Sequence, residues 1–342
     1  MKKKIFIGVQ ELCGVASGYT KGLRALGYNA DFVTYHIPKF KYSYDKYMDI
    51  KGLFPNFHRL NTISIWIKLI INALRVVFKY DCFIFLFGAS LLPRNYDLPI
   101  LKALNKQIIM VFLGCDIRTR YHKLLEDENC LLCKECTNNC DEVFKKNKVE
   151  YIEKYVDFIF AQQEYAQILT KNFYYVYVPI DTDFWYPVEN INNDVPVIVH
   201  IPSDPILKGT KYIVEAVEKL KAEGFKLDFR LLENITNEEV KINLQQADIV
   251  IDQILQGWHG VLSIEAMSLA KPTVCYLKDI YLEKTPEIPL VNANKDNIYD
   301  VLKFLIENKT ERISIGQKSR DYVLKKHAIK TAVKDFINIL EL

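Results

Sequence analysis

The sequence predicts an α/β protein made of two consecutive doubly wound, Rossmann-like domains. Three observations support this prediction. Short continuous apolar runs alternate with helical segments, which is typical of parallel sheets covered on both faces. The same alternation restarts near Asp194. The chain has 342 residues, whereas a common domain has about 150. We therefore expect two lobes that face a central cleft.

The composition excludes disordered and nucleic-acid-wrapping proteins. Half of the residues are hydrophobic and 25% are charged, so the chain can bury a normal core. The 45 basic and 42 acidic residues leave a formal net charge of +3. This charge is too small for the broad basic surface that binds nucleic acid, and we expect no such partner.

The N-terminus does not read as a targeting segment. Gln10 and Glu11 interrupt its apolar run, so these residues are better interpreted as a first strand than as a signal peptide. The chain has no uninterrupted apolar stretch of the ~18 residues that predict a spanning helix. We expect a cytoplasmic protein, either free or peripheral on the inner face of the membrane.

The N-terminal domain is expected to cover residues 1–185. Between its first two strands lies a glycine-bearing loop followed by a helix that ends at Gly27, which completes a βαβ unit. Residues 38–59 break the alternation with lysines among aromatic residues and are interpreted as a long functional loop. The strands are predicted at 5–9, 30–35, 82–87, 108–113 and 158–161.

The helix at 61–79 has two interpretations. Its polar residues recur in steps of three and four, so a core helix with one narrow polar stripe facing water is one of them. The other is peripheral docking on an anionic membrane surface, together with the lysines and aromatic rings of 38–59. The polar residues are Asn61, Ser64, Lys68, Asn72, Arg75 and Lys79.

The second half is expected to form a C-terminal domain at 194–315, after a linker at 184–193. Residues 316–342 are expected to be helical, and this helix could bridge the two lobes because no strand is left to connect. The strands are predicted at 195–201, 227–232, 249–254 and 273–277, and the helices near 209–223, 236–246 and 260–270.

Two strand-to-helix connections of the second half could bind a phosphate. Helix N-termini at the carboxyl ends of parallel strands attract anions, and Lys208 adds a positive charge to the first connection. The second connection contains a Gly-Trp-His-Gly turn at 257–260, followed by Glu265 about one turn into a helix. Taken singly, Lys208 could be an exposed turn lysine, His259 a loop histidine and Glu265 an exposed helix carboxylate.

Together these segments resemble the donor-binding lobe of GT-B glycosyltransferases of the large retaining nucleotide-sugar family. The resemblance covers residues 195–280 well and the first lobe only as a general fold pattern. It rests on Lys208-Gly209, on the turn at 257–260, on Glu265-Ala266-Met267 and on Ala270-Lys271-Pro272.

The resemblance implies transfer of a sugar from a nucleoside-diphosphate sugar to a glycan or lipid-linked saccharide, with retention. Lys208 would bind the donor diphosphate and Glu265 the ribose or sugar hydroxyls. A fixed ammonium and helix N-termini can stabilise the leaving diphosphate, so no catalytic metal is expected. The catalytic candidates are Glu265, His259 and Asp116, and the other donor-site candidates are Ser203, Gly209, Asp252, Gly257, Trp258 and Gly260.

The chain departs from the family pattern at two positions. Ser203 and Asp204 stand where an Arg usually precedes the Lys, and Gly257 stands where a Glu usually lies eight residues before Glu265. Three explanations stay open: His259 and Asp252 compensate, the donor chemistry is altered, or activity is lost. A non-catalytic GT-B subunit that binds a partner and a nucleotide-sugar epimerase are therefore alternatives.

The first lobe offers candidates for the acceptor or phosphate side. Gly14 and Ser17 belong to a loop after the first strand that resembles the glycine loop of this fold. Asp116 could orient an acceptor hydroxyl, and Arg118 could hold a phosphate with two hydrogen bonds. A structural Asp116–Arg118 ion pair is the alternative.

Four cysteines form the most specific motif of the chain, within a predicted insertion at 126–145. Their thiolates suit a tetrahedral Zn²⁺ ion that would staple a loop on the acceptor side. The spacing also matches part of a ferredoxin motif, although Asp141 follows where Pro is usual. Structural zinc is favoured over an iron–sulfur cluster or metal-free thiols. The residues are Cys130, Cys133, Cys136 and Cys140.

Overall fold

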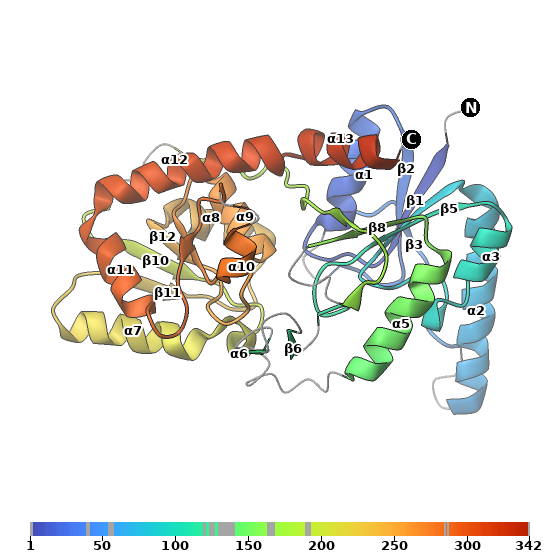
Figure 1. Cartoon of the computed structure of the whole chain (residues 1–342), viewed down its shortest axis with the longest axis horizontal. Helices are drawn as coiled ribbons and strands as arrows, with labels where there is room; N and C mark the ends of the chain where they lie inside the picture. The colour runs from blue at the N-terminus through green and yellow to red at the C-terminus, as the bar shows by residue number, and fades with distance from the viewer. Residues whose placement is uncertain are drawn as a thin grey trace. The chain divides into compact units, whose positions relative to one another are not determined.

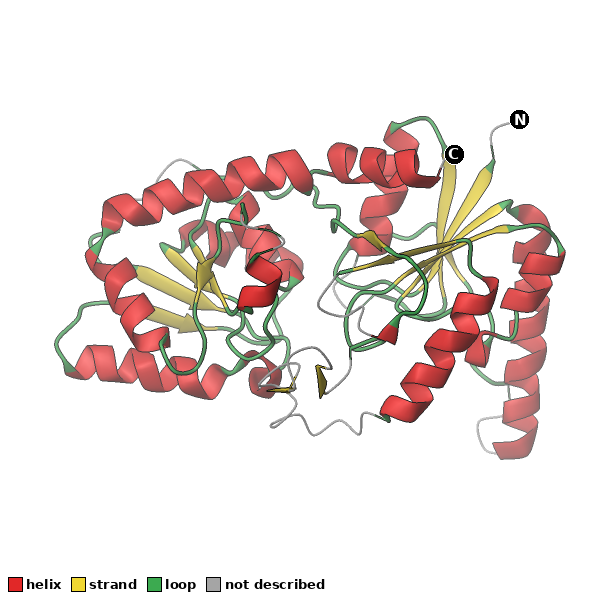
Figure 2. Ribbon diagram, in the orientation of Figure 1, coloured by secondary structure: helices red, strands yellow, loops and turns green. Residues whose placement is uncertain are grey.

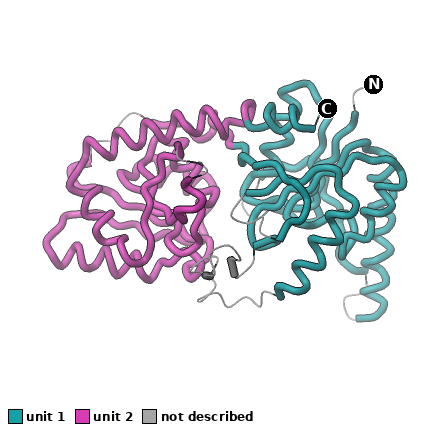
Figure 3. The backbone as a smooth tube through the Cα atoms, viewed as in Figure 1, with its two compact units in different colours: residues 1–119, 140–179, 332–342 teal, residues 120–139, 180–331 magenta. Residues whose placement is uncertain are grey.

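The computed structural model contains two compact units (Figure 3). Unit 1 takes in Met1–Thr119, Cys140–Pro179 and Ala332–Leu342, and unit 2 takes in Arg120–Asn139 and Ile180–Thr331. Besides the stretch 120–139, the chain crosses into unit 2 after Pro179 and returns to unit 1 within its last helix. The structure describes residues 3–38, 42–53, 58–118, 121–122, 127–128, 141–162, 168–188, 193–283, 285 and 287–340.

Unit 1 is built on a seven-stranded sheet in the order β3-β2-β1-β4-β5-β8-β9, and its strands all pair in parallel (Figures 1 and 2). The five strands predicted for this half are confirmed. The strands are β1 (Lys4–Val9), β2 (Asn29–Thr34), β3 (Lys46–Tyr47), β4 (Cys82–Leu86), β5 (Gln107–Val111), β8 (Phe158–Ala161) and β9 (Tyr174–Tyr175). A separate antiparallel pair, in the stretch assigned to unit 2, joins β6 (Tyr121–His122) and β7 (Asp127–Glu128).

Helices cover both faces of this sheet. One face packs on α2, α3 and α5, and Phe6, Phe83 and Phe85 of the strands belong to that core. On the other side Phe336 of α13 contacts Tyr19 of α1 and Phe160 of β8. The helices are α1 (Val15–Ala25), α2 (His58–Lys79), α3 (Leu98–Ala103), α5 (Glu142–Tyr155) and α13 (Ile329–Leu340).

The orientation of α2 differs from the expected narrow polar stripe facing water. Ser64 is buried and accepts a hydrogen bond from the amide of Leu53 (3.0 Å), while Lys68 donates to the carbonyl of Lys51 (2.7 Å) and to Asp49 (3.0 Å). Part of the polar stripe is thus tied to the preceding segment. The exposed large apolar residues of α2 are Leu60, Ile63, Trp66, Ile67, Ile70, Ile71, Leu74 and Phe78.

The segment before α2 was expected to be a loop, and its described part, 42–53, contains the edge strand β3. Lys46 and Tyr47 pair in parallel with the end of β2. Within the described ranges, α2 alone is long and apolar enough to cross a membrane, judged by length and composition.

Unit 2 has a five-stranded parallel sheet in the order β11-β10-β12-β13-β14. The four strands predicted for this half are confirmed, and β14 is an additional edge strand. The strands are β10 (Val197–His200), β11 (Asp228–Leu231), β12 (Ile249–Ile251), β13 (Thr273–Cys275) and β14 (Val291–Asn292).

The helices of unit 2 pack around a core centred on β10 and β12, in which Ile198, Ile249 and Ile251 are fully buried. The three helices predicted between its strands are confirmed as α7, α8 and α9. The helices are α6 (Pro205–Lys208), α7 (Thr210–Ala222), α8 (Asn237–Gln246), α9 (Val261–Ser268), α10 (Asp279–Leu282), α11 (Ile298–Glu307) and α12 (Lys309–Lys326).

Candidate functional site

The donor-site candidates of unit 2 gather at a topological switch point of its sheet. The strand β10 has β11 on one side and β12 on the other, so the connections that leave β10 and β12 diverge at the carboxyl edge. Ligands of open α/β sheets bind at such points. The β10 connection carries Lys208, and the β12 connection carries Asp252 and the turn at 257–260.

Lys208 and Asp252 form a buried ion pair at this point. The ammonium Nζ lies 2.5 Å from Oδ1 of Asp252, whose side chain is fully buried. The second carboxylate oxygen accepts hydrogen bonds from the hydroxyl of Ser263 (2.6 Å) and from the amide of Gly260 (2.9 Å). Asp252 therefore fixes Lys208 and the first turn of α9 in one network.

The charge state of Asp252 follows from this network. Burial alone would raise its pKa, but Lys208, Ser263 and Gly260 stabilise the carboxylate more strongly, and the pKa lies below its usual value. An ammonium has three N–H donors. Among the described residues, the recorded hydrogen bond of Lys208 Nζ is the one to Asp252, so the group retains donors for an anion.

Two glycines allow this close packing. A Cβ on Gly260 would lie 2.9 Å from Oδ2 of Asp252 and 3.1 Å from Nζ of Lys208. Gly209 has φ +76°, and a Cβ there would meet Ile254 at 2.7 Å. A side chain at either position would push the two connections apart.

Trp258 and His259 bring unsatisfied polar atoms to the same turn. The side chains are 1% and 3% exposed, and Nε1 of Trp258 and Nε2 of His259 are buried without a hydrogen-bond partner in the described part of the chain. Burial lowers the pKa of His259 to about 4, so its ring is neutral at pH 7. A buried polar atom without a partner costs free energy, which a ligand can recover by bonding to it.

Glu265 lies on the second turn of α9 and is 7% exposed. Burial, reinforced by the negative charge of Asp252, raises its pKa to about 8. The group is therefore mainly a neutral carboxylic acid at pH 7. In this form it can donate a hydrogen bond as well as accept one.

The remaining donor-site candidates differ in what they contact. Ser203 is exposed, whereas its neighbour Asp204 caps α6 by accepting hydrogen bonds from the amides of Ile206 and Leu207. Gly257 has φ +80° and its carbonyl accepts a hydrogen bond from the amide of Lys278 (3.0 Å).

Two residues of this region were not predicted. Ser263 lies one turn after His259 on α9, a spacing that could have suggested it. His200 ends β10, is fully buried, and its ring nitrogens bond Ile251 O and Thr210 Oγ1, both at 2.9 Å. Nothing in the sequence around His200 marks it, because a buried neutral histidine at a strand end has no periodic signature.

In unit 1 the backbone amides at the start of α1 donate hydrogen bonds to a side chain of the same chain. The carboxylate of Glu11 accepts hydrogen bonds from the amides of Ala16 (3.1 Å) and Ser17 (3.0 Å), and the Ser17 hydroxyl donates to the carbonyl of Gly14. A phosphate bound by Gly14 and Ser17 at this helix end would have to displace Glu11.

Asp116 and Arg118 are both buried in unit 1. The Asp116 carboxylate accepts hydrogen bonds from the amides of Gly114 (2.8 Å) and Leu113 (3.3 Å), and burial raises its pKa to about 6. Arg118 donates to Sγ of Cys115 (3.7 Å) and its carbonyl accepts from Lys145. No ion pair joins these two described residues, so Asp116 is held by the turn backbone.

The predicted metal ligands Cys130, Cys133, Cys136 and Cys140 lie outside the described residues. Elsewhere, in the described ranges, no group of three or more His, Cys, Asp or Glu side chains is placed to hold a metal ion. Zinc at the four cysteines remains a prediction.

No protein-family model and no curated protein sequence matches the chain. Several solved structures match the chain. Sucrose-phosphate synthase from Thermosynechococcus elongatus matches with a TM-score of 0.68 and 12% identity over 100% of this chain and 98% of that one. UDP-GlcNAc 2-epimerase from Neisseria meningitidis, bound to UDP-GlcNAc, matches with a TM-score of 0.57 and 12% identity over 99% of both chains.

A third match is TarM from S. aureus, in complex with UDP, with a TM-score of 0.53 and 13% identity. The match covers 82% of this chain and 59% of the TarM chain, so this chain spans less than two thirds of the length of TarM. These likenesses agree with the two parallel, doubly wound sheets. The chain has the GT-B fold.

Proposed function

We propose that the protein is a cytoplasmic glycosyltransferase that moves a sugar from a nucleoside-diphosphate sugar to a glycan or lipid-linked acceptor, with retention. The observation that carries the proposal is the cluster at the switch point of unit 2. There Lys208, the N-terminus of α9 and the unpartnered Nε2 of His259 converge at one carboxyl edge. An ammonium, helix amides and a polar ring nitrogen suit a diphosphate ester and its sugar.

Each group has a part in the proposed reaction. The bond between the anomeric carbon and the diphosphate oxygen breaks, and the leaving diphosphate takes the electron pair. Lys208 stabilises the charge that develops on that oxygen, because its position is already fixed by Asp252. His259 and Glu265 bond the hydroxyl groups of the donor. The new bond forms to an acceptor hydroxyl, whose proton leaves to solvent or to a base.

An epimerase acting on a nucleotide sugar is a second candidate, favoured by the likeness to the Neisseria enzyme over the whole chain. The two reactions differ in their products. A transferase releases the nucleoside diphosphate in proportion to the acceptor that is glycosylated. An epimerase returns an isomer of the nucleotide sugar and needs no acceptor, and a non-catalytic subunit only binds the nucleotide.

The test is a panel of nucleotide sugars incubated with the pure protein, with and without saccharide acceptors. We expect nucleoside-diphosphate release that depends on acceptor and falls at least tenfold in Lys208→Met, because a charged hydrogen bond to phosphate contributes about 1.5–3 kcal/mol. Lys211→Met, an exposed lysine of α7, is the control and should leave release unchanged. Isomerised nucleotide sugar without release would establish the epimerase instead.

We further propose that unit 1 docks on an anionic membrane surface through the exposed face of α2, as defined above. The helix carries four basic residues, Arg59, Lys68, Arg75 and Lys79, and no acidic one. Apolar side chains flanked by cations suit the boundary between acyl chains and anionic headgroups. Its opposite side is held in the core of unit 1 by Leu69, Ala73, Val76 and Val77, so the helix lies along the membrane.

A second copy of the chain is a less suitable partner for this face. Lys68 and Lys79 pair with Asp49 and Asp31, but Arg59 and Arg75 have no ion pair among the described residues. Two α2 helices packed face to face would bring these arginines together with no carboxylate on either helix to compensate. Sedimentation with phosphatidylserine vesicles should therefore succeed at low salt and weaken as salt rises. Ile67→Ser with Leu74→Ser should reduce it, whereas Ile313→Ser, an equally exposed apolar residue of α12, should not. Concentration-dependent dimerisation without vesicle binding would contradict the proposal.

A further inference from the structure

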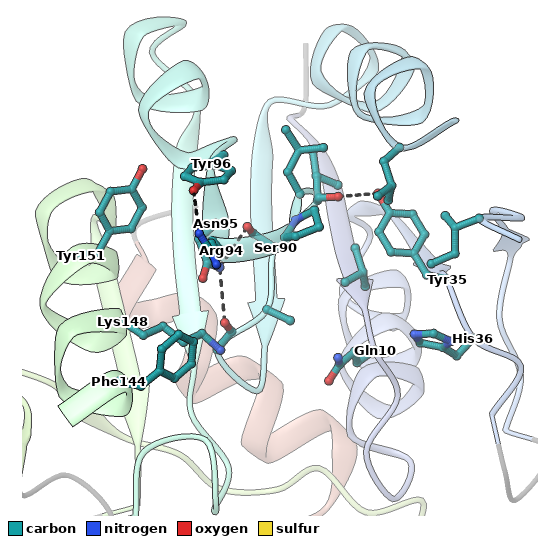
Figure 4. Close-up of a pocket in the computed structure, with 18 of the residues that line it drawn as sticks. Gln10, Tyr35, His36, Ser90, Arg94, Asn95, Tyr96, Phe144, Lys148 and Tyr151 are labelled. Atoms are coloured by element: carbon teal, nitrogen blue, oxygen red, sulfur yellow. Dashed lines mark hydrogen bonds between the residues drawn. The ribbon is translucent and has the colours of Figure 1, made fainter. Parts of the chain in front are cut away.

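Unit 1 has a pocket of about 650 Å³ at the carboxyl edge of its own sheet (Figure 4). The pocket opens between the end of β1 and the connection after β4, where the strand order β3-β2-β1-β4-β5 changes direction. It is thus the switch point of this sheet, the place where open α/β sheets bind ligands. Helix α5 and Leu69 of α2 complete its walls.

The connection after β4 is held rigidly in a strained conformation. Phe87, Arg94 and Asn95 have φ values of +58°, +57° and +61°, which residues with a Cβ rarely adopt. Such strain persists only where surrounding contacts enforce it, and it concentrates at ligand sites. Here Asp97 accepts hydrogen bonds from the Ser90 hydroxyl (2.6 Å) and from two backbone amides, and Asn95 Nδ2 donates to Ser90 (3.0 Å).

The charges that line the pocket have one sign. Lys148 of α5 and Arg94 are cations, His36 is a third basic group, and no Asp or Glu occurs among the described lining residues. Figure 4 shows Lys148 extending from α5 towards the connection after β4. Its Nζ lies 3.2 Å from the point where a Cβ on Gly88 would be, and no hydrogen bond or ion pair within the described residues holds it. Asp116 attracts it at longer range.

The rest of the wall is mainly apolar and aromatic, with Gln10, Ser90, Asn95 and Asn147 as uncharged polar residues. Val9, Ile50, Leu69 and Leu91 supply aliphatic surface. A ligand with an anionic head and an apolar body would match the cations and the aliphatic surface. Arg94, whose guanidinium donates to the Tyr96 hydroxyl (3.5 Å), and Lys148 both line the pocket. An arginine and a lysine in one pocket favour a phosphate ester, because a guanidinium can bond two oxygens and an ammonium adds a point charge.

We propose that this pocket binds a phosphate monoester with an apolar chain, its phosphate on Lys148 and Arg94 and its chain against the aliphatic wall. The identification of this ligand as the sugar acceptor rests on the proposed function, whereas the binding itself does not.

The probe is decyl phosphate below its micellar concentration, titrated calorimetrically into the full chain. We expect Lys148→Met to weaken binding about tenfold or more, and Arg94→Gln to weaken it several-fold. Lys146→Met is the matched control, because Lys146 lies on the same helix, is exposed and pairs with Glu150 instead. UDP affinity, measured on each variant, should stay unchanged and shows that unit 2 is intact.

Three further ligands distinguish the sources of binding. Decyl maltoside should bind at least tenfold more weakly than decyl phosphate, and equal binding would overturn the role of the cations. Inorganic phosphate that bound as tightly as decyl phosphate would overturn the role of the apolar chain. Decanoate that bound more tightly would replace the phosphate by a carboxylate and overturn the ligand class.

Two more outcomes separate this proposal from the others. Leu74→Ser on the outer face of α2 should leave decyl phosphate binding unchanged, and a loss in that variant alone would place the chain on α2 and overturn the pocket. If UDP does not bind but decyl phosphate binding responds to Lys148→Met, the proposed function fails and the pocket assignment stands. If UDP binds and Lys148→Met has no effect on decyl phosphate binding, the pocket assignment fails and the proposed function stands.

Discussion

Replacing Lys208 by Met should destabilise unit 2 as well as weaken nucleotide binding. The substitution leaves the fully buried carboxylate of Asp252 without its counter-ion. Breaking one side of a buried pair costs about 3–5 kcal/mol. The hydrogen bonds from Ser263 and Gly260 remain. Asp252 can also become protonated, which at pH 7 costs about 4 kcal/mol, because each pH unit above a pKa of ~3.9 contributes about 1.4 kcal/mol. This cost is an upper limit on the loss of stability. We expect a loss of about 3 kcal/mol.

The pH dependence of this loss has a definite sign. In the wild type the folded-state pKa of Asp252 is below its usual value, so its stabilisation is present above about pH 4 and is lost as the pH falls further. In Lys208→Met the folded-state pKa rises above the unfolded one. The variant then loses stability as the pH rises from the unfolded-state pKa of Asp252 to its folded-state pKa. The difference between the two proteins should therefore be smaller at pH 5 than at pH 7.

The assay is urea unfolding followed by tryptophan fluorescence in a Trp66→Phe background, in which the two remaining tryptophans, Trp185 and Trp258, both belong to unit 2. The double variant Lys208→Met with Asp252→Asn should regain most of the stability, because the buried charge is removed. It should still bind UDP at least tenfold more weakly. A fully stable Lys208→Met would refute the dependence of Asp252 on Lys208, and restored UDP affinity in the double variant would remove Lys208 from the phosphate site.

Three further predictions concern the same fold. The pKa of Glu265 is raised to about 8, so the folded protein keeps a proton that the unfolded protein loses near pH 4.5. The free energy of unfolding should therefore fall as the pH rises from about 4.5 to about 8. Glu265→Gln should abolish this slope in urea titrations at stepped pH. Gly260→Ala should lower the melting temperature and UDP affinity together, since a Cβ would lie 2.9 Å from the Asp252 carboxylate; retention of both would show that the turn relaxes. Elemental analysis should find about one zinc per chain, lost in Cys133→Ser with lower thermal stability, whereas a brown protein rich in iron would contradict zinc.

The order of strands and helices was predictable because buried parallel strands leave continuous apolar runs. All nine predicted strands are present, and the short edge strands β3, β9 and β14 were not predicted. Each has two residues, so it has no apolar run and depends on pairing with a neighbour. The face that α2 exposes was not predictable either. Its polar stripe indicated water, whereas Ser64 and Lys68 bind the preceding segment.

The candidate site, too, was predictable from the sequence only in part. Motif spacing brought Lys208, Gly260 and Glu265 to one edge of the sheet, because connections that leave neighbouring strands at a switch point must meet there. The partners of these residues could not be predicted in this way. Spacing says nothing of the ion pair between Lys208 and Asp252, which joins two connections 44 residues apart. The pocket of unit 1 likewise combines six separate segments without a local motif.

Because Gly257 has no side-chain carboxylate, another residue of the cluster would have to bond the donor sugar. Asp252 is a weak substitute for a sugar-binding Glu, because both of its oxygens are already bonded to Lys208, Ser263 and Gly260. In the proposed function it would act on the ligand through the position of Lys208. His259 is the better candidate to compensate, because its buried Nε2 has no partner in the described part of the chain. In the proposed function, a neutral imidazole and a protonated Glu265 would let the cluster bond sugar hydroxyls without adding negative charge beside the diphosphate. The single ammonium of Lys208 would then hold the diphosphate.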